Sequence, residues 1–281
     1  MTRRASRPPA LPPLRCLRIP ALLLALAFAL PTARAAIPDS LRVTTHSWLY
    51  GIGRANVLDT YLSPLEYTGP SLAAFHISER PARWGKGKVS FTGLFSGQGS
   101  RLHSPTEDGD AWDARLSAAF GWHHNWHPLR GLRLAAGGLA EASGGVTYNT
   151  RNGNNPAQGI AAADLRLSAI AEWAFRLSGR SLTACLRADA PLIGAMFSPS
   201  YGQSYYEMFS LGHGDRNVRL THPFNAPSAR MAATLTVPVA GARLTLGYAA
   251  DVRQSHVNGL KRHLWNNQFV LGYVRTIRIL R

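Results

Sequence analysis

The sequence has few cysteines and no apolar run long enough for a membrane-spanning helix. Its 281 residues include two cysteines, Cys16 and Cys185. Cys16 lies in the N-terminal leader described next, so one cysteine is left for the exported chain and no intramolecular disulfide can form there. Stability must therefore come from packing or from a membrane.

The N-terminal 35 residues have the composition of a secretory signal peptide. Residues 1–19 carry five arginines and no acid, and the apolar run PALLLALAFALP follows. Small residues at Ala33 and Ala35 then provide a cleavage site. Because the apolar run is shorter than the roughly 18–20 residues of a spanning helix, we expect a cleaved signal peptide at 1–35 and a folded domain at 36–281.

Acidic residues are also scarce. The chain has 15 acids against 31 lysines and arginines, a formal charge of +16. Six of the arginines and none of the acids precede residue 36, which leaves +10 for residues 36–281. This excess suits anionic lipid or lipopolysaccharide. Nucleic acid is not expected as a partner of an exported protein.

Apolar residues alternate with polar or small ones along most of the chain, as in β-strands with two different faces. In the segment 112–126 the even positions are almost all apolar and include three tryptophans, whereas the odd positions are charged, polar or small. Such segments recur with a length of about ten residues or more, which is what a tilted strand needs to cross a bilayer. The expected strands are 42–60, 72–83, 88–98, 112–126, 132–149, 161–177, 181–198, 227–238, 242–254 and 264–278.

The connections between these strands alternate in length. Short ones (84–87, 127–131, 178–180 and 239–241) alternate with long ones (61–71, 99–111, 150–160, 199–226 and 255–263). Outward-facing aromatics lie near both sets. Trp122, Trp126, Trp173 and Phe175 are close to short connections, and Trp112, Tyr148 and Trp265 are close to long ones. These features are typical of outer-membrane barrels. We therefore predict an all-β, antiparallel, up-and-down transmembrane β-barrel of about ten strands, or twelve if 199–226 holds another hairpin.

The lumen-facing positions carry charges of both signs. A barrel of this size is too narrow for an open channel, so we expect these charges to pair and fill the lumen, with a narrow pore as the alternative. They are Asp113, Arg115, Arg133, Glu141, Asp164, Arg166, Glu172, Arg176, Arg187, Asp189, Arg230, Arg243, Asp251 and Arg253.

Two stretches, YGIGRANVLDTYLSPLEYTG (50–69) and YNTRNGNNPAQ (148–158), resemble an uncharacterised family of Gram-negative outer-membrane proteins, a domain of unknown function. The resemblance implies an outer-membrane barrel and no particular reaction. Outer-membrane barrels commonly end in an aromatic residue that the assembly machinery reads. Here the chain runs past Tyr273 through RTIRILR, so that machinery either uses Tyr273 with a short tail or reads a different signal.

Two groups of loop residues are candidate sites. Asn149, Arg151, Asn152 and Asn155 offer planar amides and a guanidinium that suit a sugar or phosphate. Turn formation also explains this composition. Asp108, Asp110, His213 and Asp215 are similar to the paired acids and the Asp/His pair of the omptin outer-membrane proteases, although the His and Asp come in reversed order. A His–Asp pair can act as a general base.

Three histidines in the stretch GWHHNWHPLRG suggest a metal site. However, His123 and His124 point to opposite faces of a strand, and His127 lies roughly 13 Å along the strand from His123. Because zinc binds nitrogen ligands at about 2 Å, these histidines cannot share one ion. Replacing all three should leave folding and metal content unchanged. No metal or cofactor is expected, since the sequence has no metal-ligand spacing or nucleotide fingerprint.

The sequence thus predicts a barrel exported to the outer membrane of a Gram-negative bacterium, with a structural or binding role. Its outer loops are expected to contact lipopolysaccharide, glycan or a partner protein. The alternative is an outer-membrane hydrolase, either omptin-like or lipid-active, with its site at the outer rim.

Overall fold

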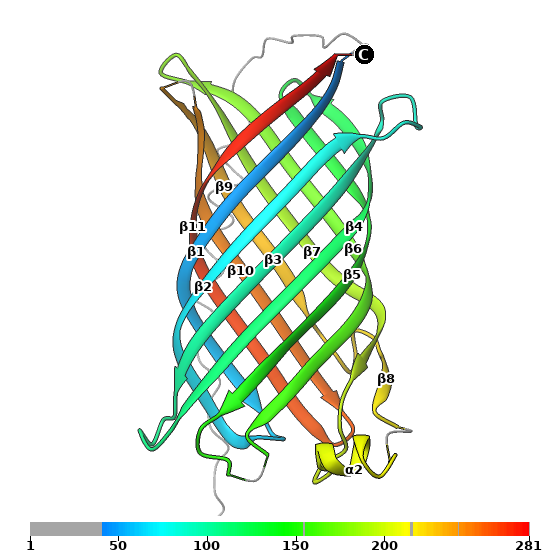
Figure 1. Ribbon diagram of the computed structural model, residues 1–281. Helices are drawn as coiled ribbons and strands as arrows, with labels where there is room; N and C mark the ends of the chain where they lie inside the picture. The colour runs from blue at the N-terminus through cyan, green and yellow to red at the C-terminus, as the bar shows by residue number, and fades with distance from the viewer. Residues whose placement is uncertain (1–40, 154, 214–215, 241, 281) are drawn as a thin grey trace, which may run out of the picture. The chain divides into compact units, whose positions relative to one another are not determined.

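The computed structural model describes residues 41–153, 155–213, 216–240 and 242–280, and Figure 1 shows their arrangement. All of them belong to one compact unit. The predicted signal peptide, residues 1–35, lies outside the described residues. No helix in the described part of the chain is long and apolar enough to cross a membrane.

The described elements are long strands and one short helix. Their bounds are β1 Leu41–Asp59, β2 Ser63–Pro81, β3 Val89–His103, β4 Asp110–Leu129, β5 Leu132–Asn149, β6 Ala157–Leu177, β7 Arg180–Phe197, α2 Tyr205–Phe209, β8 Val218–Thr221, β9 Ala229–Val239, β10 Ala242–Val257 and β11 Leu260–Leu280.

Ten of the strands close into one antiparallel ring. The hydrogen-bonded order is β6-β5-β4-β3-β2-β1-β11-β10-β9-β7, and the pairing of β6 with β7 closes it. The short strand β8 pairs only with the last residues of β7. The predicted ten-stranded barrel is therefore confirmed. The segment 199–226 holds α2 and β8 rather than another barrel hairpin, so the twelve-stranded alternative is wrong.

The two faces of the strands separate apolar from polar side chains as the alternation predicts. In β4 the burial pattern alternates from Ala111 to Trp126, with the odd positions buried in the lumen and the even, mostly apolar positions exposed. An exposed face of this kind is favourable only against lipid or another protein. A closed barrel with this face, and with a polar interior, is the architecture of outer-membrane proteins.

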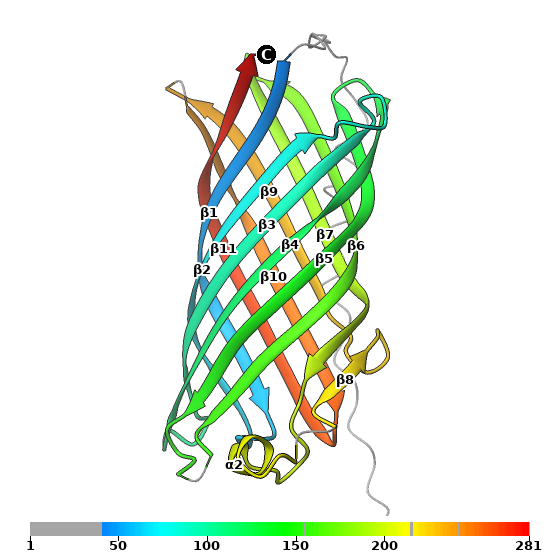
Figure 2. The same cartoon turned by 45° about the vertical axis from the view of Figure 1, so that its right-hand side comes forward.

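The barrel has two different ends, which Figures 1 and 2 show at the bottom and the top. We call the end with Leu41 and Leu280 the terminal end; it also carries the β2–β3, β4–β5, β6–β7 and β9–β10 connections. The opposite end, with the remaining connections and α2, is the loop end. The even number of strands thus brings the first and the last strand of the barrel to the same end.

Two of the predicted long connections are wrong. The expected loop 61–71 is a turn at 60–62 followed by β2, whose Ser63–Ser71 part pairs with β1. The prolines and the glycine in this stretch suggested a loop. The strand accommodates Pro70, which lacks an N–H, because the β2–β3 ladder skips residues 69 and 70. Gly69 is needed because a Cβ there would collide with the Arg101 carbonyl oxygen.

The expected loop 255–263 is a hairpin instead. Val257 pairs with Leu260, and only Asn258 and Gly259 lie between β10 and β11. Both have positive φ, 53° and 74°. An Asn-Gly pair is the strongest short sequence signal for a two-residue hairpin turn, so this turn could have been predicted. Strict alternation of short and long connections is therefore not a property of this barrel.

The predicted aromatic belts face outward. Trp112 and Tyr148 are opposite each other on β4 and β5 near the loop end, and both are exposed. Near the terminal end, Trp173 and Phe175 have ring centroids 4.9 Å apart. Belts at two heights suit headgroup regions on the two sides of a membrane.

Candidate functional site: the polar lumen and the loop end

Ion pairs fill the middle of the lumen, as the sequence predicts. We call this group the central cluster; it consists of Glu141, Arg166, Asp189, Arg230, Asp251 and Arg253. Glu141 is fully buried and lies 2.8 Å from Arg230 and 3.2 Å from Arg253. Asp189 lies 2.5 Å from Arg166 and 3.0 Å from Arg230. The cluster joins five strands, β5, β6, β7, β9 and β10.

A second group lies nearer the terminal end. This terminal cluster consists of Glu79, Arg133, Glu172 and Arg187. Arg133 forms ion pairs with Glu79 and, at 3.1 Å, with Glu172. Arg187 reaches Glu79 at 3.3 Å. These side chains come from β2, β5, β6 and β7. The pairs of Glu79 with Arg133 and Arg187 cross the lumen, whereas Arg133 and Glu172 are opposite each other on adjacent strands.

Charges also close the lumen at the loop end. Arg115 binds both carboxylate oxygens of Asp113 at 2.9 and 3.0 Å, and Thr147 donates to the same carboxylate at 2.7 Å. Arg262 lies 3.2 Å from Asp59 and donates to Thr147 at 3.3 Å. Both signs are thus paired in all three groups, which is how buried charges become tolerable.

The histidine stretch is divided among three environments. His123 is fully buried in the lumen, with Nδ1 3.1 Å from the Thr92 hydroxyl and Nε2 2.9 Å from the Ser168 hydroxyl. His124 is exposed on the outer face, and its ring is tilted against that of Trp126 with the centroids 4.7 Å apart. His127 is exposed at the terminal end. Among the described residues, no group of three or more His, Cys, Asp or Glu side chains could hold a metal ion.

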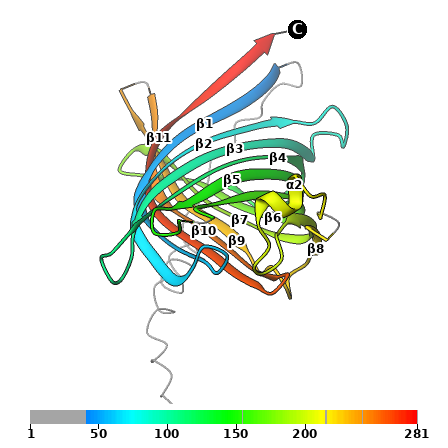
Figure 3. The ribbon, with the colours of Figure 1, turned by 60° about the horizontal axis from the view of Figure 1, so that its bottom comes forward.

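A strap of chain lies across the loop end (Figure 3). It comprises residues 198–213 and 216–217, with α2 in its middle. The Tyr205 hydroxyl accepts the Gly159 N–H at 2.5 Å and donates to Gln158, both on β6. The Tyr61 hydroxyl, on the β1–β2 turn, donates to the Gln203 carbonyl at 2.9 Å. Because β6 and β1 are far apart in the ring, these bonds hold the strap over the lumen.

The strap is reinforced by local hydrogen bonds. Ser204 and Glu207 form a capping box at the start of α2, and the hydrogen bond from the Ser204 backbone N–H keeps the pKa of Glu207 below its usual value. Burial raises the pKa of Tyr61 to about 12, and the neighbouring Tyr205 adds to the shift. The Asn258 amide donates to the carbonyls of Ser198 and Arg216. The strap is therefore tied to the β10–β11 turn as well.

Two of the acids predicted as catalytic candidates, Asp108 and Asp110, are engaged in ion pairs near the loop end. Asp108 lies 2.7 Å from Arg151. The pKa of Asp108 is lowered mainly by the hydrogen bond that its carboxylate accepts from the Thr106 hydroxyl. Asp110 pairs with Arg101 at 2.9 Å and His103 at 2.8 Å. The His213 backbone belongs to the strap, where its carbonyl accepts from Gln203. Asp215 lies outside the described residues, so the protease arrangement stays a prediction.

The predicted polar loop site uses its side chains within the loops. Asn149 is buried and accepts the Arg151 N–H at 2.9 Å. Asn152 accepts the Asn155 N–H at 3.1 Å and donates to the Leu62 carbonyl at 3.2 Å. These hydrogen bonds, together with the ion pair between Arg151 and Asp108, are of the kind that stabilises turns. Recognition of sugar or phosphate by these residues stays a prediction.

Two cavities lie inside the barrel. One, of about 480 Å³, opens from the terminal cluster toward the terminal end; Cys185, His127 and several threonines line it. We call it the vestibule.

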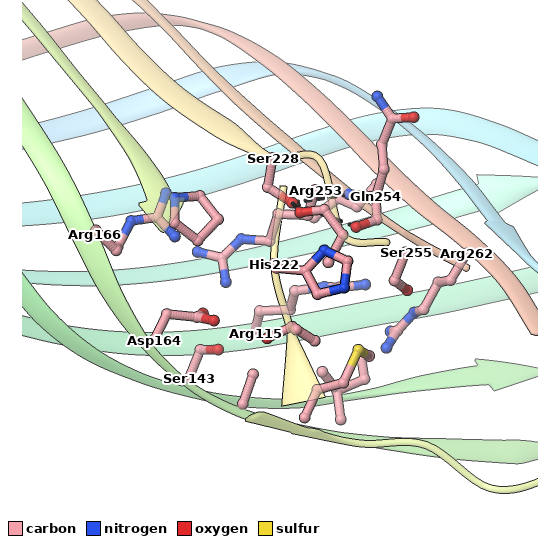
Figure 4. A pocket seen from close by; sticks show the side chains of 17 residues that line it. Arg115, Ser143, Asp164, Arg166, His222, Ser228, Arg253, Gln254, Ser255 and Arg262 are labelled. Carbon is pink, nitrogen blue, oxygen red and sulfur yellow. Dashed lines mark hydrogen bonds between the residues drawn. The ribbon is translucent and has the colours of Figure 1, made fainter. Parts of the chain in front are cut away.

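The other cavity, of about 80 Å³, lies toward the loop end and is shown in Figure 4. His222 is one of its lining residues. The His222 ring accepts a hydrogen bond from the Phe224 N–H, and among the described residues no serine hydroxyl is hydrogen-bonded to this ring. No nucleophile–base pair is therefore formed there.

Sequence and structure comparisons find the following likenesses. A family model described as "Protein of unknown function (DUF3316)" matches residues 19–281. No curated protein matches the sequence. The chain is similar to the translocator domain of autotransporter NalP from Neisseria meningitidis, with 12% identity, 91% of this chain and 93% of that chain covered, and a TM-score of 0.38.

Two further solved structures are similar. For the beta domain of the Bordetella autotransporter Brka, the identity is 10%, the coverage 85% of this chain and 99% of that chain, and the TM-score 0.40. For the COG4313 outer membrane channel from Pseudomonas putida F1, the identity is 10%, the coverage 89% and 100%, and the TM-score 0.34. None of these likenesses bears on the role of the chain.

Proposed function

The chain belongs to the DUF3316 family of proteins of unknown function, and we propose that it is a non-conducting outer-membrane barrel that binds lipopolysaccharide at its loop end. In this proposal residues 1–35 direct export and are cleaved, and the assembly machinery of a Gram-negative bacterium inserts the barrel. The loop end faces the outside of the cell, and the terminal end faces the periplasm.

The filled lumen supports a binding role over transport. The terminal, central and loop-end ion pairs lie one after another along the barrel, and the strap covers the last of them. A solute moving along the axis would have to break buried pairs, each of which costs several kcal/mol to disrupt (about 3–5). A pore therefore fits the interior poorly.

The observation that carries the proposal is an exposed surface on the strap, on β8 and on the residues that follow β8. We call it the rim surface; its apolar members are Tyr201, Tyr206, Phe209, Leu211, Val218, Leu220 and Phe224. Val218 is 71% exposed and Phe224 is 95% exposed. Two exposed arginines, Arg216 and Arg219, lie within the same segment. Large apolar side chains in this number on a loop mark an interaction site.

Lipopolysaccharide matches this surface in both respects. Its phosphates suit guanidinium groups, which bind them with two donors at once. Its acyl chains and the headgroup boundary suit aromatic and aliphatic side chains. It also surrounds any barrel in the outer leaflet, so the rim surface would meet it without a separate encounter step.

Binding of lipopolysaccharide to the refolded full-length barrel in detergent tests the proposal. The double variant Arg216→Gln/Arg219→Gln should bind roughly ten- to thirty-fold more weakly, because each basic side chain near an anionic lipid surface is worth about 1 kcal/mol. The matched control is Arg83→Gln/Lys86→Gln, which removes two exposed charges from the β2–β3 connection at the terminal end. This control should bind like the parent protein.

Three outcomes would reject the proposal. One is equal binding by the two double variants. Another is binding to phosphatidylcholine vesicles as tight as to lipopolysaccharide. The third is equal binding to the lipid-free polysaccharide, which would point to a glycan-binding protein instead.

A further inference from the structure

The barrel wall is interrupted on the loop-end side of β7. The β7–β9 ladder ends where Asp189 pairs with Arg230, and the β7–β8 ladder begins at Gly194. On this edge, residues 190–193 of β7 have no ladder partner among the described strands. Beyond β9, β10 continues to Val257 with β11 as its only neighbour. We call this interruption the wall gap.

Prolines explain why the ladder stops here. Pro191 lies within the unpaired part of β7 and has no N–H to donate on either edge. The β6–β7 register shifts at the same place, where Leu165 pairs with Ile193 but Arg166 pairs with Pro191. Pro227 precedes the first residue of β9 by two positions. The gap is thus built into the sequence.

The segment 222–228 fills the gap with isolated hydrogen bonds. The His256 N–H donates to the Asn225 carbonyl at 2.8 Å. The Ser228 hydroxyl accepts from the Gln254 N–H at 3.1 Å and lies 3.4 Å from the Gln254 carbonyl. One backbone bond and one side chain replace a continuous ladder, so this part of the wall should separate more readily than its neighbours.

The 80 Å³ cavity adjoins the gap, since residues of the gap line it; Figure 4 shows Ser228 and Gln254 among its lining side chains. Its lining includes Ala226, Ser228 and Gln254 from the gap together with Arg115, Asp164 and Arg253 from the lumen. The volume is about that of three water molecules, which suits a phosphoryl group. The cavity therefore joins polar groups of the lumen to the side of the barrel.

Two arginines and one aspartate that line this cavity can form further hydrogen bonds. Arg115 and Arg253 use Nε and Nη2 for Asp113, Asp251 and Glu141, and no hydrogen bond of their Nη1 atoms is found among the described residues. Asp164 forms no ion pair within the described part of the chain. Its carboxylate packs against Gly194, where any Cβ would collide with it.

The outside of the gap is apolar. Leu192 and Ile193 of β7, Leu220 of β8 and Met231 of β9 are exposed large hydrophobic side chains there. Arg115 follows the belt residue Trp112 by three positions on β4, so the cavity lies roughly 10 Å along the strand from the loop-end belt. The belt itself marks the headgroup level, so a headgroup reaches the cavity by moving inward through the gap.

We propose that the wall gap and its cavity form a lateral binding site for a phospholipid with an ammonium headgroup. The phosphate binds the Nη1 groups of Arg115 and Arg253, and the primary ammonium binds Asp164. The acyl chains leave through the gap onto Leu192, Ile193 and Leu220. This inference rests on the membrane placement proposed above but not on lipopolysaccharide binding at the rim surface.

The test uses delipidated full-length protein in detergent and native mass spectrometry. The probes are phosphatidylethanolamine, phosphatidylglycerol and free O-phosphoethanolamine. We expect one bound phosphatidylethanolamine per chain, at least tenfold preference over phosphatidylglycerol, and weak binding of the free headgroup. Asp164→Asn should abolish that preference, whereas the matched control Asp108→Asn, an exposed loop acid, should keep it.

A second variant guards against a loss of binding through misfolding. Ala226→Phe fills the cavity and should prevent binding, while Ala163→Phe, on the exposed face of β6, should not. Heat-modifiable gel mobility verifies that each variant is folded. Equal affinity for the two lipids, equal affinity for the free headgroup, or full binding by Ala226→Phe would overturn the proposal. Arg216→Gln/Arg219→Gln should retain the phospholipid, which separates this site from the rim surface.

Discussion

Arg187 on β7 donates to Glu79 on β2 at 3.3 Å, across the full width of the barrel. The two strands are five positions apart in a ring of ten, which is the largest separation that the ring allows. Glu79 also binds Arg133 of β5. One carboxylate therefore connects three parts of the wall and separates the vestibule from the lumen above it.

Removal of that carboxylate should destabilise the barrel. Glu79→Ala leaves Arg187 without its ion-pair partner and Arg133 with Glu172 alone, and the expected loss is about 3 kcal/mol of unfolding free energy. Urea unfolding in detergent micelles measures it. Glu66→Ala is the matched control, since Glu66 is 53% exposed and its loss should cost less than about 0.5 kcal/mol. Equal losses in the two variants would show that the cross-barrel pair contributes nothing.

The histidine stretch gives a second prediction. His123 is fully buried and bonded to two hydroxyls, so His123→Ala should cost about 2–3 kcal/mol of unfolding free energy. His124→Ala, on the exposed face, should cost less than about 0.5 kcal/mol. The structure thus revises the expectation that replacing all three histidines leaves folding unchanged. Metal content should still be unchanged; elemental analysis that finds a stoichiometric metal, lost in the triple variant, would refute this.

The strap should respond to high pH through Tyr61. Its folded pKa is raised to about 12 from a usual value of 10.0. Below pH 10 the phenol is protonated in both the closed and the open strap, and the contribution of its hydrogen bond is fully present. As the pH rises from 10 to about 12, only the open strap releases the proton, so closure weakens in that range. The ultraviolet absorbance of tyrosinate follows the titration.

Tyr61→Phe is the control for the strap. It removes the titrating hydroxyl that binds the Gln203 carbonyl, so limited proteolysis within the strap should lose its pH dependence in this range. Tyr50 is exposed on the outer face. Tyr50→Phe is therefore a matched variant in which proteolysis of the strap should keep its pH dependence. A Tyr61 that titrates near pH 10 in the folded barrel would contradict the buried hydrogen bond.

Cys185 reports on the orientation of the barrel. It is the one cysteine after residue 35, and it lines the vestibule, which opens at the terminal end. A maleimide too bulky for porins should leave Cys185 unlabelled in intact cells and label it once the outer membrane is permeabilised. Gly153→Cys, in the β5–β6 connection of the loop end, should be labelled in intact cells. Labelling of Cys185 in intact cells would mean an inverted barrel or an open lumen.

Much of the fold follows from the alternation in the sequence. In β4 the same pattern that separates Trp112 and Trp122 from Asp113 and His123 decides which face meets lipid and which meets the lumen. It therefore predicts closure, the belts and the inward charges. The turn at Asn258 and Gly259 was also readable from its residue types, although the surrounding polar residues suggested a longer loop.

Partners across the barrel could not be predicted. Whether Glu79 meets Arg187 depends on the register of every strand between them, and alternation determines which face a residue occupies but not its height. The wall gap depends in the same way on where the β7–β9 ladder ends. Pro191 was visible in the sequence, but its effect on that ladder follows only from the register.

Single-channel recording in a planar lipid bilayer tests the central claim, that paired charges close the lumen, most directly. The folded wild-type barrel should give no current steps above the bare bilayer. Combined replacement of Glu79, Arg133 and Arg187 by serine should still give no steps, because the central cluster and the loop-end ion pairs remain in the lumen. Regular open-channel steps from the wild-type protein would contradict the account.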